Sequence, residues 1–438
     1  MPTAPEELFV GLDIGTTAAK AVAYTAAGDA VASGQAVTPW AITPTGAEVA
    51  AEDLLTSATT ALGQMLRECP AGRIAGLGVT GLAESGVLVD GSGVPLAPVI
   101  AWHDTRDGAE LSALRAAFPG DEFAATTGLP LRQQWSITKH LWLHRNLPES
   151  RAAVRRFNVG EWLVRALGGD EATEQSLASR TGWLDLRRRA WWPEALEWSH
   201  ARASLMPPIV TAGTPLGTVR SDCGLDRLGG AVLTVAGHDH QVAAIGAGAA
   251  GAGDQLDSCG TAEAIVRSVE PTLDPDRVLA LTSRGITVGW HAAAGHWCLL
   301  GGTQGGLALQ RILSMLGHPR DELDRGALAV DAPAVRVDAP AFGKVTIGDI
   351  GDSVTPAQVW RAALESVTDQ VAELHEAMTA ASGPHRTFVV TGGWATSPAL
   401  MEVKRRRFGA VVPATVDQAG ARGAAMLAAQ AAGAEFSG

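Results

Sequence analysis

The chain of 438 residues has few cysteines, no long uninterrupted apolar run and no excess of basic residues. Its four cysteines lack C-x-x-C spacing, which argues against a zinc ribbon or a disulfide framework and predicts ordinary buried thiols. No apolar run is long enough to span a bilayer. The net charge of −12 opposes nucleic-acid binding, because phosphates are neutralised by basic surfaces. The composition therefore predicts a soluble globular protein without a membrane or nucleic-acid role.

The length exceeds that of a single hydrophobic core, so we expect two domains of about 200 residues with a site in the cleft between them. The start, MPTAPEELFV, lacks the basic and apolar regions of a secretory signal, which favours a cytoplasmic protein. The one basic run, VKRRRFG, is expected to be a solvated helix face. We attribute the abundance of alanine and glycine to genome composition rather than to function.

Hydrophobic periodicity indicates an α/β protein. Three antiparallel strands are predicted for LFVGLDIG, AAKAVAY and AVASGQAV, because turn residues separate these apolar stretches. A helix is predicted over residues 51–69, where apolar residues recur at helical spacing. The run RIAGLGVTG that follows is typical of a buried strand.

The second half of the chain repeats this plan. GDQLDSCGTAEAIVRSV is similar to LFVGLDIGTTAAKAVAY, since in each an aspartate (Asp257, Asp13) shortly precedes a Gly-Thr turn between apolar strands. Later, RTFVVTGG repeats RIAGLGVTG after a helical stretch, PAQVWRAALESVTDQVAELHEAM. We therefore predict an internal duplication into two domains, residues 1–241 and 242–438.

The two Gly-Thr turns suit a nucleotide. Such a turn directs backbone N–H groups and a hydroxyl group toward the oxygens of a phosphate. Asp13 beside the first turn is able to hold Mg²⁺ through water, and Lys20 adds a positive charge. A single Gly-Thr turn is usually structural, but two turns at the same point of a duplication favour a phosphate site.

The segment AGHDHQVAAIGAGA has three interpretations: a metal site, a helix cap and a catalytic base. In a strand His238 and His240 share one face while Asp239 lies on the other, and in a helix the histidines do not face each other. A zinc or iron site is therefore disfavoured. Aspartate is a favoured N-cap, which would stabilise the carboxylate and lower its pKa. The residues themselves leave cap and base open, and the two roles do not exclude each other.

Six segments, in this order, resemble the FGGY carbohydrate kinases over residues 9 to 433. They are GLDIGTTAAKAVAY, GLGVTGLAESGVLVDGSGVPLAPVIAWHDTR, TEQSLASRTGWLDL, VAGHDHQVAAIGAGA, LDSCGTAEAIV and VVTGGWATSPALMEVKRRRFG. The resemblance implies two duplicated RNase H-like (actin-like) α/β domains with an interdomain cleft. It also implies phosphorylation of a sugar hydroxyl with ATP and Mg²⁺ as cofactors. The substrate it favours is a ketose or polyol, within that class a ketopentose or 6-deoxy-ketohexose. The oligomeric state stays open, with a homodimer as one alternative.

The same resemblance implies roles for individual residues. Asp239 corresponds to the catalytic base that accepts the hydroxyl proton during phosphoryl transfer. The implied sugar contacts are Glu84, Trp102, Asp104 and His240. Arg106 is expected to brace the loop that carries Asp104. Two alternatives stay open, namely that Glu84 pairs with a structural arginine and that Trp102 only fills the core.

On the nucleotide side, the resemblance implies a Mg²⁺ held through water by Asp13. The ATP and phosphate contacts are Asp13, Gly15, Thr16, Thr17, Lys20, Gly260, Thr261, Gly302, Gly305, Gly392, Gly393 and Ala395. Trp394 departs from the family, which usually has a third glycine there, and either stacks on the base or narrows the pocket. A Leu-Pro-Tyr-Leu-x-Gly-Glu-Arg-x-Pro segment of many relatives is also missing. The rival hypothesis is a non-catalytic sugar or nucleotide sensor on the same fold.

Overall fold

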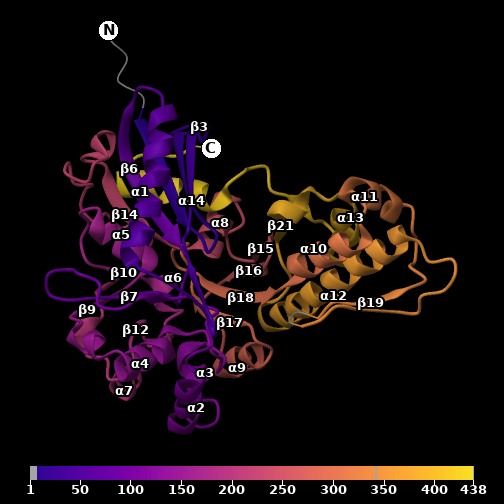
Figure 1. The fold of residues 1–438 in the computed structure, drawn as a ribbon, viewed down its shortest axis with the longest axis horizontal. Helices are drawn as coiled ribbons and strands as arrows, with labels where there is room; N and C mark the ends of the chain where they lie inside the picture. The colour runs from indigo at the N-terminus through magenta and orange to yellow at the C-terminus, as the bar shows by residue number, and fades with distance from the viewer. Residues whose placement is uncertain (1–6, 341–342, 438) are drawn as a thin grey trace. The chain divides into compact units, whose positions relative to one another are not determined.

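The computed structural model describes residues 7–340 and 343–437, which form two compact units (Figure 1). Unit 1 comprises the chain up to Gly246, residues 289–296 and the chain from Gln418 onward. Unit 2 comprises residues 247–288 and 297–417. The boundary predicted after residue 241 falls inside helix α8 (Asp239–Gly246), which lies wholly in unit 1. The division by duplication remains a prediction.

Unit 1 is built on a five-stranded sheet in the order β14-β6-β1-β2-β3. Its strands are β1 (Glu7–Ile14), β2 (Ala18–Thr25), β3 (Ala30–Val37), β6 (Arg73–Gly81) and β14 (Val232–His238). Strands β1, β2 and β3 are antiparallel, which confirms the three strands predicted from the sequence. Strand β6 is parallel to β1, and β14 is parallel to β6.

Helices cover both faces of this sheet. Val10 of β1 belongs to the core that α1 (Ala51–Glu68) closes, whereas its neighbour Phe9 packs on the other face against α14 (Ala419–Ala431). Helix α14 approaches the strands very closely, since a Cβ on Gly11 would lie 1.8 Å from the carbonyl oxygen of Ala421. Gly76 and Gly78 allow the same approach on β6. Packing therefore requires glycine at these three positions, whatever the origin of the abundance of glycine in the chain.

Smaller elements complete unit 1. Its other strands are β4 (Ala41–Thr43), β5 (Gly46–Val49), β7 (Gly86–Val89), β8 (Val99–Ile100), β9 (Arg155–Asn158), β10 (Thr173–Glu174), β11 (Leu184–Asp185), β12 (Ala190–Trp191) and β13 (Ile209–Val210). Its other helices are α2 (Gly108–Ala117), α3 (Glu122–Thr127), α4 (Ser136–Asn146), α5 (Val159–Ala166), α6 (Gln175–Ala178) and α7 (Pro193–Trp198). Short 3₁₀ helices are η1 (Pro148–Ala152), η2 (Ala203–Leu205) and η3 (Asp226–Leu228).

Unit 2 repeats the pattern on a six-stranded sheet in the order β17-β18-β16-β15-β21-β22. These strands are β15 (Asp254–Cys259), β16 (Glu263–Val269), β17 (Thr287–Trp290), β18 (Trp297–Thr303), β21 (Thr387–Thr391) and β22 (Val412–Pro413). Strand β15 pairs antiparallel with β16 and parallel with β21, as β1 does with β2 and β6. The predicted second hairpin is therefore confirmed.

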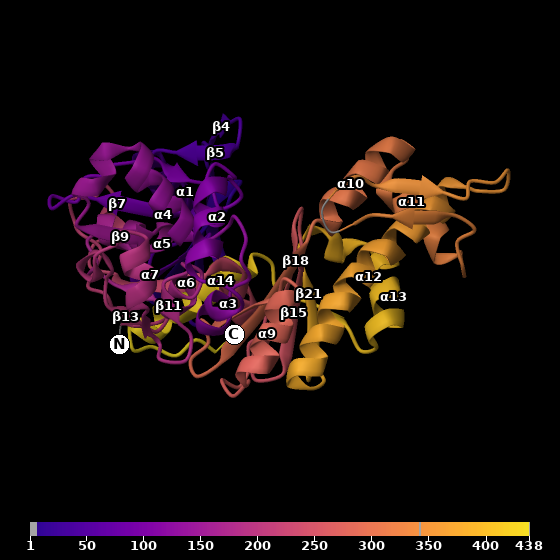
Figure 2. The same cartoon turned by 90° about the horizontal axis from the view of Figure 1, so that it is seen from below.

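The helices of unit 2 gather beside this sheet (Figure 2). They are α9 (Pro275–Ser283), α10 (Gly305–Leu316), α11 (Arg320–Leu328), α12 (Pro356–Ser382), α13 (Pro398–Phe408) and the 3₁₀ helix η4 (Gly393–Thr396), with a small ribbon of β19 (Arg336–Asp338) and β20 (Thr346–Gly348). Helix α12 begins at a capping box formed by Thr355 and Gln358, so local sequence defines its first turn.

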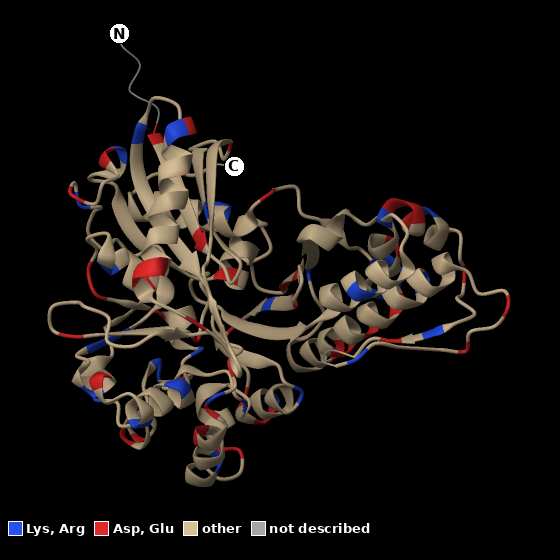
Figure 3. Cartoon of the chain, viewed as in Figure 1, with Lys and Arg blue, Asp and Glu red and all other residues tan. Residues whose placement is uncertain are grey.

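Charged residues of both signs are interspersed over each unit (Figure 3). In the basic run on α13, Arg405 to Arg407 are exposed as predicted, but Lys404 is fully buried. The four cysteines are free thiols, three of them buried, whereas Cys223 is only half-buried. Along the described residues, no helix combines the length and the apolar character that crossing a membrane requires.

Candidate active site

Three parallel strands of unit 1 end at the same edge of the sheet. Ile14 at the end of β1 and His238 at the end of β14 both pair with Gly81, the last residue of β6. Residues directly after these positions therefore project from one edge, where ligands bind in α/β sheets. Asp13, Glu84 and Asp239 lie at this edge, so three carboxyl groups from distant parts of the sequence meet there.

Asp13 lies near the end of β1, opposite Lys20 on β2. Its Oδ1 is buried and has no hydrogen-bond partner among the described residues. Burial and, to a smaller extent, the Asp239 carboxylate raise the pKa of Asp13 to about 7, while Lys20 opposes the shift. Helix α14 begins beside this carboxyl, since a Cβ on Gly420 would lie 2.5 Å from Oδ2. A buried carboxyl oxygen without a protein partner is suited to a hydrated cation.

Asp239 is the first residue of α8, directly after β14. Its Oδ1 accepts a hydrogen bond from the backbone N–H of His240 at 2.6 Å and lies 3.2 Å from Nε2 of His238. The bond to the adjacent residue is not the N-cap bond that was predicted, which would reach one turn further. Burial raises the pKa of Asp239 to about 7, although the His240 N–H opposes the shift. The lowered pKa expected of a capping carboxylate is therefore wrong.

Buried hydrogen bonds hold the turn that carries Asp239. The backbone N–H of His238 donates to Oγ of Ser176 at 3.0 Å, and this hydroxyl donates to Glu174. Glu174 is fully buried, and burial raises its pKa to about 8. Gly237 has φ +115°, and a Cβ there would lie 2.7 Å from Oγ of Ser176. This buried network fixes the backbone from which the Asp239 side chain projects.

Glu84 is buried, 4% exposed, and has an unusual φ of 67°. Its Oε1 accepts hydrogen bonds from Arg180 Nε at 2.7 Å and from Gln134 Nε2 at 3.1 Å. The structure thus contains the arginine pair that the sequence left as an alternative. Burial is the main cause that lowers the pKa of His240, and the Arg180 charge lowers it further. The same charge opposes the rise in the pKa of Asp239.

Asp104 and Arg106 form a clamp at the start of the loop. The Asp104 carboxylate is fully buried and accepts hydrogen bonds from the backbone N–H, Nε and Nη2 of Arg106 at 2.9 to 3.0 Å. Nη1 of Arg106 donates to Glu48 at 2.6 Å, so Arg106 braces the loop as expected. Burial would raise the pKa of Asp104, but the bonds from Arg106 hold it at about 2. These contacts do not support the predicted sugar contact of Asp104.

The turn of the first hairpin presents its side chains outward. Thr16 and Thr17 are exposed, whereas the carbonyl oxygen of Gly15 accepts a bond from Oγ1 of Thr38 at 3.0 Å. Trp102 is half-buried and lies beside this turn, because its Nε1 is 3.4 Å from Oγ1 of Thr16. Trp102 is therefore not a core residue, which removes the alternative of pure core filling.

The second hairpin in unit 2 has an equally open turn. Thr261 is exposed, and the N–H of Gly260 donates to the carbonyl oxygen of Ala262 at 3.1 Å. Helix α10 begins against this turn, since a Cβ on Gly306 would lie 1.7 Å from the carbonyl oxygen of Gly260. Gly392 has φ +94°, and a Cβ there would lie 2.5 Å from the carbonyl oxygen of Cys259. Glycine is required at both places for backbone to meet backbone.

The other glycine-rich positions of unit 2 surround the second hairpin. Gly302 is exposed at the end of β18, and Gly305 begins α10 beside Glu263. Gly393 faces open space, and the N–H of Ala395 donates to the carbonyl oxygen of Gly392. The nucleotide residues predicted in unit 2 therefore lie at the ends of β15, β18 and β21 or shortly after them.

Trp394 packs against protein in this structure. Its ring lies 6.1 Å from that of Trp360, and the guanidinium of Arg320 lies 5.8 Å above it. The indole therefore has an apolar partner in the core of unit 2 and a cationic partner on the outside. The Trp394 ring is therefore in contact with protein side chains from two sides.

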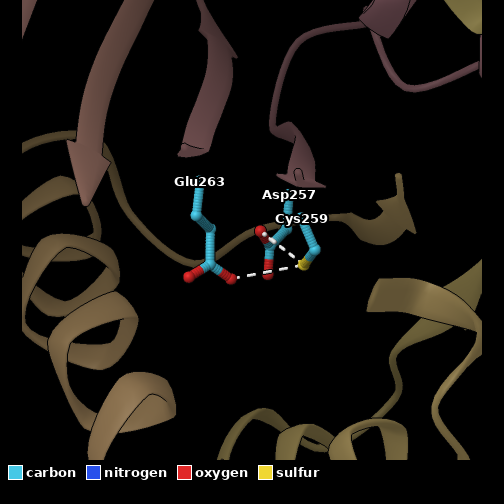
Figure 4. A group of neighbouring side chains, drawn as sticks. All are labelled: Asp257, Cys259 and Glu263. Atoms are coloured by element: carbon cyan, nitrogen blue, oxygen red, sulfur yellow. Dashed lines mark hydrogen bonds between the residues drawn. The ribbon is translucent and has the colours of Figure 1, made fainter. Parts of the chain in front are cut away.

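A buried charge cluster lies under the second hairpin (Figure 4). Nζ of Lys404 is 2.5 Å from Oδ2 of Asp257 and 2.8 Å from Oε1 of Glu263, and Sγ of Cys259 is 3.2 Å from both carboxyls. Burial alone would lower the pKa of Lys404, but the two carboxylates raise it, so the ammonium stays charged. Asp257, Cys259 and Glu263 form the one group in the described part of the chain with the spacing of metal ligands. The Lys404 ammonium group already supplies the positive charge that a metal ion would bring to these side chains.

The structure brings the predicted residues together in two groups, one in each unit. Asp13, Asp239, His240, Glu84 and Trp102 lie along the strand edge of unit 1, and the segment from His238 to His240 forms no metal cluster with other described residues. Sequence reasoning gave no role to Arg180, Ser176, Glu174 and Lys404. Three of these four lie in TEQSLASRTGWLDL, a segment already recognised for its resemblance, so the segment was a usable signal.

The sequence and the fold of the chain both match those of known carbohydrate kinases. The N-terminal domain of the FGGY family of carbohydrate kinases matches residues 8–246, more than half of the chain, and the C-terminal domain matches residues 333–432. The glycerol kinase of Janthinobacterium sp. (strain Marseille) is 29% identical over 96% of this chain and 89% of that protein. The xylulose kinase of Streptomyces coelicolor is 29% identical over 99% and 89%. In fold, the Plasmodium falciparum glycerol kinase crystallised with ADP matches with a TM-score of 0.88, 18% identity and coverage of 98% and 90%.

Proposed function

Because the chain belongs to the FGGY family of carbohydrate kinases, we propose that it transfers the γ-phosphoryl group of ATP to a hydroxyl group of a ketose or polyol, with Asp239 as the general base. The observation that carries this proposal is the Asp239 carboxyl, which is held at the end of β14 with its pKa raised to about 7 by burial. The names of the relatives, glycerol kinase and xylulose kinase, support a substrate range from polyols to ketoses. Within it we keep a ketopentose or a 6-deoxy-ketohexose as the narrower proposal.

The proposed chemistry asks little of the protein beyond position and charge. The substrate hydroxyl gives its proton to Asp239 while its oxygen attacks the γ-phosphorus, and ADP leaves with the electrons of the broken bond. A base works best when its pKa lies near the operating pH, and a value of about 7 meets this condition. The contacts of Oδ1 with His238 and His240 leave Oδ2 as the oxygen for the substrate proton.

Magnesium fits the first hairpin. The unpartnered buried Oδ1 of Asp13 is the kind of hard oxygen that binds a hydrated Mg²⁺. A bound cation would also remove the repulsion between Asp13 and Asp239, which contributes to the raised pKa of Asp13. When bound with ATP, the ion neutralises charge that develops on the phosphates.

On the sugar side we propose Glu84, His240 and Trp102 as contacts, with Arg180 as an additional one. The Arg180 pair orients the Glu84 carboxylate, whose oxygens are able to accept hydroxyl hydrogen bonds. The half-buried Trp102 ring offers an apolar face beside Thr16. For Asp104 we propose a positioning role through Arg106 in place of direct contact.

For ATP we propose that each hairpin binds phosphate oxygens through its turn. In unit 1 these residues are Gly15, Thr16, Thr17 and Lys20, and in unit 2 they are Gly260, Thr261, Gly302, Gly305, Gly392, Gly393 and Ala395. The exposed threonine side chains of both turns support this role. The proposal also divides the functions, with sugar and base on residues 1–241 and most of the nucleotide contacts on 242–438.

The test measures ADP release from Mg-ATP with a panel of ketoses, polyols and aldoses. Wild type is compared with Asp239→Asn and with Asp121→Asn, a matched change at an exposed aspartate of unit 1 whose side chain caps nothing. We expect a sugar-dependent rate that falls by about 10²- to 10⁴-fold in Asp239→Asn and is unchanged in Asp121→Asn. ATP binding without turnover on any sugar would favour the sensor, and a rate unaffected by Asp239→Asn would refute the base.

A further inference from the structure

A second pocket in unit 1 lies apart from the candidate active site. Its volume is about 400 Å³, within the range of small-molecule sites. The pocket is formed by α4, η1 and the segment from His200 to η2. None of the residues proposed above for base, sugar or ATP belongs to its lining. The pocket is therefore a candidate for a different ligand.

The floor of the pocket contains a buried histidine without a partner. His140 is 7% exposed, and neither Nδ1 nor Nε2 has a hydrogen-bond partner among the described residues. Burial lowers its pKa to about 3, so the ring is neutral and offers one N–H donor and one acceptor. Buried polar groups are nearly always hydrogen-bonded, so an orphaned ring indicates a missing water or ligand.

Two cavities meet at this ring. His140 lines the pocket and also a separate cavity of about 20 Å³, which is large enough for one water. A water there is able to serve one ring nitrogen. The other nitrogen is left for a ligand in the larger pocket.

The rim of the pocket is basic. Arg151 and Arg202 are exposed, and the main chain holds both: Nε of Arg151 donates to the carbonyl oxygen of His144 at 2.8 Å, and Nη2 of Arg202 donates to that of Ala153 at 2.9 Å. A guanidinium has five N–H donors, so each retains several for a ligand. The rings of His144 and His200 stack beside them at 4.8 Å.

No acidic side chain lines the pocket among the described residues. Glu149 of η1 and Glu197 of the preceding helix α7 are exposed and lie outside the lining. Basic and acidic positions both occur along α4 and the segments next to it (Figure 3), but none of the acidic ones belongs to the lining. A guanidinium group recognises phosphate by two parallel N–H bonds, and the apolar lining residues Ala153, Ala201 and Leu205 suit the carbon part of a ligand.

We propose that this pocket binds a small organic phosphate, with the phosphate between Arg151 and Arg202 and the carbon part over His140 and Leu205. Three features support the assignment: the two main-chain-anchored guanidinium groups, the orphaned imidazole and the volume. The site goes beyond the proposed kinase reaction, because it needs neither ATP nor the sugar.

The test is calorimetric titration of the full chain, without ATP, with glycerol 2-phosphate, inorganic phosphate and glycerol as three probes. Arg151→Gln/Arg202→Gln is compared with Arg67→Gln/Arg115→Gln, which makes the same charge change at exposed arginines of unit 1. We expect one-to-one binding of the ester that weakens about tenfold or more in the pocket variant and less than about twofold in the control. Binding of the ester should also be tighter than that of inorganic phosphate.

Three results would overturn the proposal: no saturable binding of the ester, equal losses in both double variants, or inorganic phosphate binding as tightly as the ester. Equal losses would indicate general charge attraction or binding at the ATP turns. A His140→Phe variant adds an independent readout, since it keeps the ring volume and removes both nitrogens, and it should weaken the ester. The titration is run without ATP, so a negative kinase assay would not change its result. A negative titration would likewise leave the proposed kinase activity untouched.

Discussion

The first and second hairpins occupy equivalent places in the two sheets, yet their aspartates have opposite environments. Asp13 precedes the turn in unit 1 and has a buried Oδ1 without a partner among the described residues. Asp257 precedes the turn in unit 2 and is bonded to the buried ammonium of Lys404 at 2.5 Å. The backbone pairing is the same in both, antiparallel to the next strand and parallel to a later one.

The two hairpins thus share the same backbone pairing, while the side chains around each aspartate differ and decide its chemistry. In unit 1 the negative charge is left for a ligand, in our account Mg²⁺. In unit 2 the Lys404 ammonium group neutralises the Asp257 carboxylate, so Asp257 helps to stabilise the second hairpin. Changing one residue in each unit should therefore have different consequences, stability in unit 2 and activity in unit 1.

Lys404→Met should have the largest effect on stability. The change leaves Asp257 and Glu263 buried without their cation, and loss of one partner of a buried ion pair costs about 3–5 kcal/mol. Urea unfolding measures the loss. Arg405→Met, at the exposed neighbouring position of α13, is the control and should change the free energy of unfolding by less than about 0.5 kcal/mol. Equal losses of unfolding free energy in the two variants would show that the ion pairs of Lys404 do not stabilise the second hairpin.

Asp13→Asn should show the reverse behaviour. Because the carboxylate is proposed to hold Mg²⁺, kcat should fall by about 100-fold or more, which corresponds to several kcal/mol of charge stabilisation. The free energy of unfolding should stay the same or rise, since the variant removes a buried, unpaired charge. Steady-state kinetics at saturating Mg-ATP and urea unfolding give both numbers. A loss of stability with unchanged kcat would make Asp13 a structural residue like Asp257.

The pH dependence of activity should follow the ionisation of Asp239 and Asp13. Asp239 must be ionised to accept a proton, and its pKa is about 7, so kcat/KM should fall as the pH drops below about 7. Asp13 has a pKa of about 7 as well, so the observed midpoint belongs to the pair. Arg180→Gln should move the midpoint upward, because the Arg180 charge lowers the pKa of Asp239. A flat profile between pH 5 and 8 would count against Asp239 as the base.

The free energy of unfolding should fall as the pH rises, whereas kcat/KM should rise over the same range. Burial raises the pKa of Asp239 in the folded state above its unfolded value, so folding favours the protonated form. This contribution is fully present below the unfolded pKa and is lost as the pH rises through about 7. We expect a decrease of about 1–3 kcal/mol between pH 5 and pH 8. Asp239→Asn should reduce the slope, and an unchanged slope would place the titration elsewhere.

Much of the fold could be predicted because local patterns determine it. The strands β1 to β3, the helix α1 and the second hairpin follow from apolar periodicity and Gly-Thr turns, and the structure has each of them. The packing of α14 on the sheet of unit 1 could not be predicted in the same way. It depends on Gly11, Gly76 and Gly78, whose missing side chains matter only once the helix is known to lie there.

The candidate site was predicted unevenly for a similar reason. Residues within recognisable segments, such as Asp13 and Asp239, do lie together at one strand edge. Lys404 was missed because it stands in a basic run, and only the three-dimensional structure shows that it points inward while Arg405 points outward. The pairing of Glu84 with Arg180 joins residues that are 96 positions apart, which no local pattern records.

The most direct test of the account is the phosphoryl-transfer step itself in Asp239→Asn. The variant and wild type are loaded with Mg-ATP and mixed with the sugar found in the panel, and a single turnover is followed by rapid quench. The account predicts that the transfer rate falls by about 100-fold or more while the dissociation constant of ATP is unchanged. A transfer rate equal to that of wild type would show that Asp239 does not take the proton, and the base would have to be another residue.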